Sequence, residues 1–254
     1  MSEFDITCDP LNPAQVFACA GLLEAVALRH PAVLGHFQYD PRHPRQATFR
    51  LAGADLAGAS LPAALKAAQV EAVPGFSGGE APIRLHVEGW GHLELDWWLL
   101  PTRTEKSDLK LWAGQQTTVK LVHDMQEALP DGLDPEIWNV RVAMSGRFGL
   151  DPRAAWNALD FGSSPDAQGQ KVYTFPATEL FAAIGLQGHR PRPLARGRYA
   201  YWLWLEPLPL VAARAACGGA LPDPATPAFQ FEVSKRNKSY SSFTFAHPLE
   251  GGRP

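Results

Sequence analysis

The chain has 254 residues, enough to bury the core of one large domain or of two small ones. Hydrophobic residues make up 46% of the sequence and charged residues 19%, which excludes disorder on the scale of the whole chain. The net charge of −3 excludes a uniformly basic protein, and no apolar run approaches the roughly 20 residues of a membrane span.

The first half of the chain predicts both strands and helices. Sequences suited to strands occur at 4–8, 35–39, 47–51, 83–87 and 93–99. Apolar residues at helical spacing or in Ala/Leu-rich runs predict helices at 13–28, 54–71 and 118–129, the second interrupted near Pro62. The segment PGFSGGEAP at 74–82 predicts a flexible loop, which could separate two small subdomains.

The first helix has the clearest start. Asn12 is a suitable N-cap, and Pro13 suits the first helical position because its missing N–H is not needed there. Gln15 occupies the third helical position, where a capping box places Glu or Gln to accept from the N–H of the N-cap residue. The pattern therefore predicts a capping-box variant.

The second half continues the mixture. Residues 139–170 are predicted to be irregular, since Gly, Pro and Asp are interspersed with aromatic residues. Helices are predicted from Pro176 to about Leu186 and at 207–217, and strands at 199–205, 229–233 and 240–246, the last two as a hairpin with a basic tip. The absence of regular strand–helix alternation predicts a single α+β domain over residues 1–254, with mixed antiparallel sheets and flanking helices.

Motifs of known catalytic chemistry are absent from the sequence. It has no P-loop, no dinucleotide-binding glycine motif, no zinc-protease helix and no nucleophile elbow. The separated cysteines Cys8, Cys19 and Cys217 predict reduced thiols in a cytoplasmic protein, and the N-terminus lacks the pattern of a signal peptide. We therefore expect no cofactor, no metal ion and no enzyme activity.

The segment between residues 139 and 170 leaves two interpretations open. Asp151, Asp160 and Asp166 could gather a cation, although turn-capping roles explain such aspartates more simply. Arg147, Asp151 and Arg153 could form an internal ion network instead. Both hypotheses give these side chains a local role.

The most informative segment is DWWLLPTRTEKSDLKLWAGQQ, residues 96–116. Its notable side chains are Trp97, Trp98, Trp112, Lys110, Gln115 and Gln116. A tryptophan buries roughly 150–250 Å² and its indole N–H requires a partner, so one interpretation is a core of strands leading into a helix, which we expect for Trp97 as for Trp202. The other is a stacking platform at a helix N-terminus, where backbone N–H groups suit a phosphate.

Positive charge gathers toward the C-terminus. Residues 186–254 hold 9 Lys and Arg against 4 Asp and Glu, whereas residues 1–185 hold 14 against 22. Two basic segments result, one with Arg190, Arg192, Arg196 and Arg198 and one with Lys235, Arg236 and Lys238. Arginine pairs bidentately with phosphate and stacks on bases, so these segments suit a polyanion, while solvated surface loops remain the alternative.

Six blocks in the sequence together resemble a known family. They are DPLNPAQVFACAGLLEA, LDWWLL followed by LKLWAGQQ, FGLDPRAAWNALDFGSSPD, PATELFAAIGLQGHRPR, YAYWLWLEPLP and SYSSFTFA. Their content and order resemble the third of the Csb-named protein families of type I-G (formerly I-U) CRISPR–Cas loci, from about residue 5 to residue 246. The chain departs from the family pattern at Ala14, at Gly188 and in GSSP at 162–165.

The resemblance implies a non-catalytic subunit of a Cascade-like type I CRISPR–Cas effector in antiviral defence. Its expected ligands are guide RNA, target DNA or both, and its expected partners are the other effector subunits and, indirectly, the helicase–nuclease. The Asn12-Pro13 helix start is similar to that of large-subunit proteins in related loci, which implies a role in engaging target DNA or its PAM. The resemblance also implies that eleven side chains in the tryptophan-rich and basic segments contact nucleic acid. They are Lys110, Trp112, Gln115, Gln116, Arg190, Arg192, Arg196, Arg198, Lys235, Arg236 and Lys238.

Two other functions stay open at this point. A metal-independent endoribonuclease that matures guide RNA would need an acid–base set near the scissile 2′-hydroxyl, for which the sequence offers His36, His189, Lys238 and Tyr240. A structural scaffold would contact only proteins, and its uneven charge would serve assembly. RNA cleavage by the purified protein would favour the first of these two.

Overall fold

The computed structural model describes residues 3–54, 61–144, 146–155, 172–221, 226–235 and 240–249. Its helices are α1 (Pro13–Arg29), α2 (Leu61–Lys66), α3 (Thr118–Glu127), α5 (Pro176–Gly188) and α6 (Leu210–Cys217), with 3-10 turns at Ile137–Asn139 and Pro152–Ala154. Its strands are β1 (Glu3–Cys8), β2 (Leu34–Tyr39), β3 (Ala47–Ala52), β4 (Gln69–Ala72), β5 (Ile83–Val87), β6 (Gly91–Leu95), β7 (Val142–Met144), β8 (Val172–Thr174), β9 (Arg192–Ala195), β10 (Arg198–Trp202), β11 (Leu208–Pro209), β12 (Ala228–Lys235), β13 (Ser241–Phe243) and β14 (His247–Pro248).

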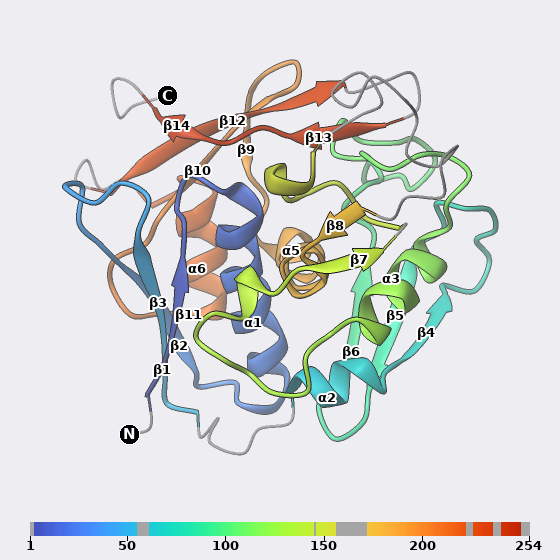
Figure 1. Ribbon diagram of the computed structural model, residues 1–254, viewed down its shortest axis with the longest axis horizontal. Coiled ribbons are helices and arrows are strands. Elements are labelled where there is room, and N and C mark those ends of the chain that lie inside the picture. Colours follow the sequence, from blue (N-terminus) through green and yellow to red (C-terminus); the bar gives the residue numbers. More distant parts are fainter. Residues whose placement is uncertain are drawn as a thin grey trace.

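Antiparallel sheets surround a central pair of helices, α1 and α5 (Figure 1). A four-stranded sheet of order β1-β3-β2-β11 lies on one side, and a three-stranded sheet of order β4-β5-β6 lies on the other. A five-stranded sheet, β13-β12-β10-β9 with β14 beside β12, covers a third side, and β7 pairs with β8. The predicted α+β fold with antiparallel sheets and helices is confirmed.

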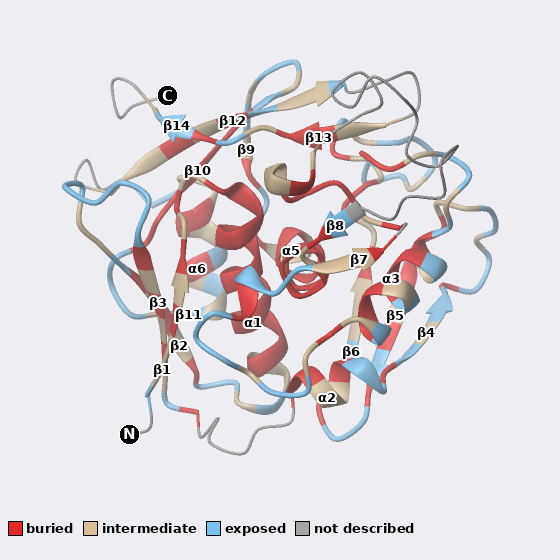
Figure 2. Cartoon of the chain, viewed as in Figure 1, coloured by how far each residue is buried: buried red, intermediate tan, exposed pale blue. Residues whose placement is uncertain are grey.

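The two central helices pack closely along their length. A Cβ atom at Gly21 would overlap the carbonyl oxygen of Phe181, and one at Gly185 would overlap that of Phe17. Farther along, the Glu24 side chain of α1 lies against the last turn of α5. Figure 2 shows both helices as almost wholly buried, as expected for helices that are apolar on every side.

The start of α1 confirms part of the predicted capping box. The Asn12 side chain accepts a hydrogen bond from the Ala14 N–H at 3.1 Å, and Pro13 opens the helix. Gln15, however, accepts from the N–H of Asp9 at 2.6 Å, while the Asn12 N–H donates to the Asp9 carbonyl oxygen. The reciprocal bond of a capping box is therefore absent, because a turn before the helix already engages the N–H of Asn12.

Non-local pairing overrides two helix and strand predictions. The helix predicted at 54–71 is wrong beyond Leu61–Lys66, because Gln69–Ala72 pairs with β5 as strand β4; residues 55–60 lie outside the described part. The strand predicted at 93–99 ends at Leu95, because the Asp96 N–H donates to the Gln187 side chain and the chain then turns.

The remaining elements largely follow the sequence. Helices α3 and α5 and the β12–β13 pairing are confirmed, whereas Leu208-Pro209 forms an edge strand, so α6 begins only at Leu210. The segment predicted to be irregular contains β7 and a 3-10 turn, and residues 156–171 lie outside the described part. The 74–82 loop joins β4 to β5 within one sheet, and residues on both sides of it belong to one hydrophobic cluster.

Candidate functional site

The tryptophans of the most informative segment lie in the core. Trp97, Trp98 and Trp112 are at most 1% exposed, and their rings meet edge to face at centroid distances of 5.4–6.0 Å. The predicted contact of Trp112 with a nucleic acid is therefore wrong, because no base can reach its ring. The core interpretation is confirmed for Trp97 and for Trp202, which is 6% exposed.

Lys110 is paired within the fold, beside the tryptophan cluster. Its ammonium group lies 2.9 Å from Glu80 Oε1, donates to the Trp112 carbonyl oxygen and is 10% exposed. Burial acts to raise the pKa of Glu80, but hydrogen bonds from Lys106 and Lys110 outweigh it and leave that pKa below its usual value. The charge of Lys110 is already neutralised, so the structure contradicts its predicted role as a polyanion contact.

The amide pair lies before α3. Gln115 is exposed and Gln116 is half-buried in the turn that precedes the helix. The N-cap of α3 is Thr117, whose hydroxyl accepts from the N–H of Lys120 at 3.2 Å. One of the N–H groups expected to bind a phosphate is therefore already satisfied by a side chain.

The first basic segment divides into two parts. Arg190 donates to the Trp97 carbonyl oxygen at 2.9 Å and lies 3.6 Å from Asp96 Oδ1, and Arg192 stacks over the Trp202 ring at 5.6 Å. Both guanidinium groups thus support the fold around the strand ends. Burial also lowers the pKa of Arg190.

The second part of that segment meets the second basic segment. Arg196 and Arg198 are exposed at the β9–β10 turn, where Gly197 has a positive φ of 72°. The register Arg198↔Glu232 brings this turn beside the end of β12, and the Val233 N–H donates to the Gly197 carbonyl oxygen at 2.7 Å. Lys235 ends β12 and is exposed there.

We call Arg196, Arg198 and Lys235 the basic turn. None of the three side chains makes a hydrogen bond or ion pair with the described part of the chain. Glu232, opposite Arg198, is the acidic neighbour across the strands. Arg236 and Lys238, the other predicted contacts of the second basic segment, lie outside the described residues. The basic turn is therefore the part of the predicted interface in which the structure shows unpaired guanidinium and ammonium groups.

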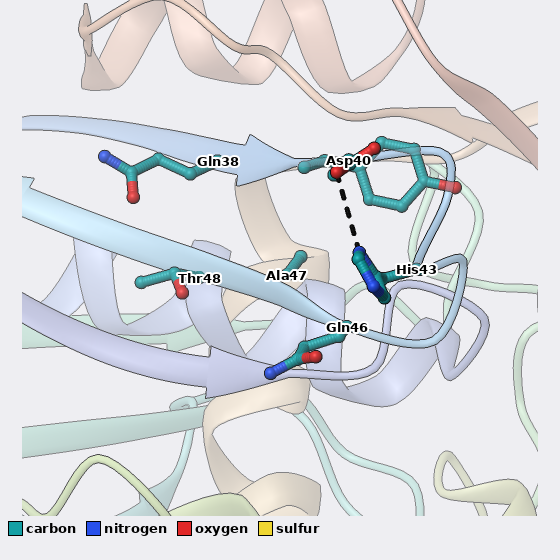
Figure 3. A pocket seen from close by; sticks show the side chains of 7 residues that line it. Gln38, Asp40, His43, Gln46, Ala47 and Thr48 are labelled. Carbon is teal, nitrogen blue, oxygen red and sulfur yellow. Dashed lines mark ion pairs between the residues drawn. The ribbon is translucent and has the colours of Figure 1, made fainter.

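A second polar surface surrounds the turn between β2 and β3. A shallow hollow of about 340 Å³ there is lined by Gln38, Tyr39, Asp40, His43, Gln46, Ala47 and Thr48 (Figure 3). Asp40 accepts from Arg42 at 2.7 Å and lies 3.5 Å from His43 Nδ1. The bidentate Arg42 guanidinium holds the pKa of Asp40 below its usual value.

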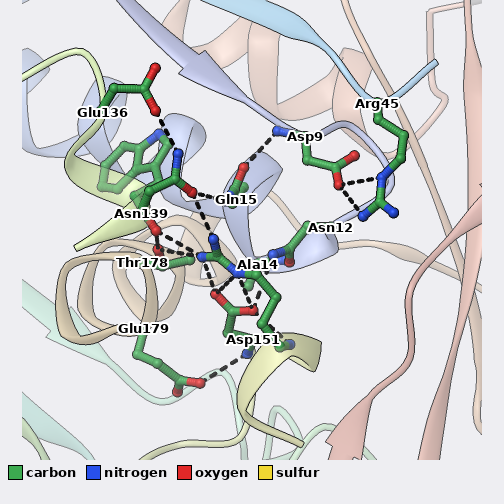
Figure 4. Close-up of polar contacts among 12 residues, drawn as sticks. Asp9, Asn12, Ala14, Gln15, Arg45, Glu136, Asn139, Asp151, Thr178 and Glu179 are labelled. Atoms are coloured by element: carbon green, nitrogen blue, oxygen red, sulfur yellow. Dashed lines mark hydrogen bonds and ion pairs between the residues drawn. The ribbon is translucent and has the colours of Figure 1, made fainter. Parts of the chain in front are cut away.

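A groove of about 270 Å³ adjoins this hollow and shares Gln46 with it. Its polar lining is already connected: Arg45 donates to Asp9 at 2.6 Å, and Gln15 donates to Asn139 at 3.3 Å (Figure 4). Arg153 donates to the same Asn139 oxygen at 2.7 Å. The lining arginines are thus balanced by carboxylates, and the groove offers amides rather than net charge.

A buried carboxylate pair lies beneath the groove. Asp151 is 0% exposed, pairs with Arg153 at 2.6 Å and accepts from the Asn12 amide at 3.1 Å. Glu179 is also 0% exposed and accepts from the Gly149 and Asp151 N–H groups. Burial raises the pKa of Glu179 to about 7.

The predicted ion network is confirmed for Asp151 and Arg153. Arg147 instead donates to the Tyr240 hydroxyl at 3.1 Å and stacks over its ring. Asp160 and Asp166 lie outside the described residues. Among those described, no three His, Cys, Asp or Glu side chains gather as they would around a metal ion.

The residues offered for a ribonuclease do not form one site in the described part of the chain. His189 is 0% exposed, stacks on Trp204 and lies 3.2 Å from Glu24 Oε1, so RNA cannot reach it. Burial outweighs the effect of Glu24 and lowers the pKa of His189. Tyr240 contacts Arg147, His36 lies on β2, and Lys238 is outside the described residues.

Sequence reasoning missed the hollow at the β2–β3 turn. The segment DPRHPR shows there as a basic, proline-rich turn, but the side chains that line the hollow come from the flanking strands. The available signal is alternation: Thr48 falls between the buried Ala47 and Phe49, and Gln38 follows the buried Phe37, so both lie on the outer face of the sheet.

Comparison with known proteins gives no match. No model of a protein family, no curated protein and no solved structure matches the chain. Of the helices described, none has both the length and the apolar character that crossing a bilayer requires.

Proposed function

We propose that the chain is a non-catalytic subunit of a type I CRISPR–Cas effector ribonucleoprotein that binds guide RNA, target DNA or both. The family resemblance carries the assignment to such a complex. The observation that supports nucleic-acid binding is the basic turn, where arginines and a lysine from two distant segments lie exposed and unpaired. Phosphate contacts of this kind position a strand, while guide pairing would read the sequence.

The blocks that carry the resemblance correspond to the interior of the fold. They include α1, α5, the tryptophan cluster and β10, which pack around each other. A shared interior supports a shared fold more than a shared site, so the function needs its own experiment. The buried Asp151–Arg153 pair also falls within these blocks.

The experiment is co-expression of the chain with the backbone and crRNA-processing subunits of a type I-G system. We expect a stoichiometric complex that contains guide RNA. The variant Arg196→Ala/Arg198→Ala/Lys235→Ala should weaken retention of nucleic acid, whereas Lys120→Ala, which removes an exposed lysine already paired with Asp124, should not.

Three results would contradict the proposal. Exclusion of the chain from the complex would show that the resemblance misleads about its role. Cleavage of repeat RNA by the purified chain would favour the endoribonuclease. Incorporation into the complex with no effect of the triple variant on nucleic acid would favour the scaffold that contacts only protein.

A further inference from the structure

The hollow at the β2–β3 turn contains hydrogen-bonding groups that the fold does not use. The side chains of Gln38, Gln46 and Thr48 make no hydrogen bond with the described part of the chain. Gln38 and Thr48 are cross-strand partners, and Gln46 lies two residues before Thr48, so all three lie on the outer face of the sheet (Figure 3). Two free amides and a hydroxyl thus line one hollow.

The charge of the hollow does not favour a phosphate or a cation. Its one carboxylate, Asp40, is engaged by the Arg42 guanidinium through three hydrogen bonds, and no lysine or arginine is among the residues that line it. Two residues with rings, Tyr39 and His43, are also among those that line it. Amides beside rings suit a planar, uncharged, hydrogen-bonding ligand, which in a nucleic acid is an unstacked base.

We propose that this hollow binds one unstacked nucleobase of single-stranded nucleic acid, with adenine preferred. A glutamine amide matches adenine because it can accept from N6 and donate to N7 at the same time. The proposal rests on the proposed function, since it assigns a base-binding position to the same strand that the basic turn would hold by its phosphates.

One strand connects the hollow to the basic turn. The Tyr39 ring meets Phe229, near the start of β12, at a centroid distance of 5.9 Å, and Lys235 ends that strand. Seven residue steps of about 3.3 Å separate the two ends of β12, or roughly 23 Å. At about 3.4 Å per nucleotide, a stacked single strand would cover that distance in roughly seven nucleotides.

The test compares oligoadenylate and oligouridylate RNA of about ten nucleotides, long enough to span both positions at the spacing above. Binding of the full chain is measured by fluorescence anisotropy at low salt. We expect at least about fivefold tighter binding of oligoadenylate, the lower end of what one bidentate base contact provides. In Gln38→Ala/Gln46→Ala, the preference should disappear while binding of oligouridylate is unchanged.

The matched control is Arg196→Ala/Arg198→Ala, which should weaken both oligonucleotides equally and keep the preference. All four side chains are exposed, so neither variant should unfold the chain, which a melting curve verifies. Equal binding of both oligonucleotides, or a preference that survives the double glutamine variant, overturns the inference but not the proposed function. No binding of either oligonucleotide, by the chain or by its assembled complex, overturns both.

A further outcome identifies a protein ligand instead. If the glutamine variant binds both oligonucleotides as the unaltered chain does but fails to join the effector subunits, the hollow is a subunit contact and the inference is wrong.

Discussion

Gly21 of α1 and Phe181 of α5 approach so closely that a single added methyl group would overlap the Phe181 carbonyl oxygen. The contact is between backbones, so no side-chain rotation can relieve it. We expect Gly21→Ala to lower the free energy of unfolding by about 2 kcal/mol, even though alanine favours a helix by about 1 kcal/mol over glycine. Urea denaturation measures the change.

The matched control for that substitution is Gly132→Ala. A Cβ atom there would meet nothing within 4 Å. Its free energy of unfolding should stay within about 0.5 kcal/mol of the unaltered chain. Equal stability of both variants would mean that α1 and α5 are not in backbone contact.

Glu179 should make stability depend on pH. Its pKa is about 7 in the folded chain, against 4.5 for a free glutamate, because burial disfavours the charged form. Between these values the folded state holds a proton that the unfolded state has released, so this group's contribution to stability is lost as pH rises from 4.5 to 7.

The variant Glu179→Gln isolates that contribution, because glutamine resembles the protonated acid. Relative to the unaltered chain, we expect it to gain up to about 3 kcal/mol of stability between pH 4.5 and pH 8. Urea denaturation at several pH values measures the difference. A constant difference would show that Glu179 titrates alike in both states.

Arg153 should be needed to keep Asp151 buried. Arg153→Met removes the partner of a fully buried carboxylate, which should cost about 3 kcal/mol of stability. Adding Asp151→Asn removes the uncompensated charge and should restore part of that loss. Chemical denaturation of the two single variants and the double variant gives the coupling energy, and additive effects would contradict a direct pair.

The salt dependence of nucleic-acid binding should distinguish the exposed, unpaired cations of the basic turn from the paired Lys110. Removing Arg196, Arg198 and Lys235 should reduce the log–log slope of affinity against salt by about 2, at roughly 0.7 per phosphate contact on a single strand. Lys110→Met should leave the slope unchanged and lower stability instead, because Lys110 is paired with Glu80 in the core. A smaller slope for Lys110→Met with unchanged stability would show that Lys110 contacts the nucleic acid.

Local signals predicted the elements that depend on local chemistry. Asn12-Pro13 correctly starts α1, and Pro176 correctly starts α5, because caps and proline act within one turn. The strand Gln69–Ala72 was not predictable in the same way, since its conformation depends on pairing with β5. An Ala/Leu-rich sequence favours a helix until a partner strand is available.

The site residues that the sequence could not place are those whose environment depends on residues distant in the chain. A basic residue within the sequence does not reveal whether it is paired, and the partner of Arg190, Asp96, lies far away in the chain. The exposure of Trp112 was equally undecided, because the rings that cover it come from Trp97, Trp98 and Phe148. The position of the β9–β10 turn beside the end of β12 depends on the β10–β12 register, which no motif encodes.

The pairing of α1 with α5 also has a consequence for how the protein is made. Helix α1 ends at Arg29 and its partner begins only at Pro176, so a ribosome working at about 5–20 residues per second takes roughly 7–30 seconds to supply the second helix. Throughout that interval the side of α1 that packs against α5 has no cover. A shortened polypeptide that stops before α5 should therefore aggregate, and newly made chains should depend on chaperones until Gly188 has emerged.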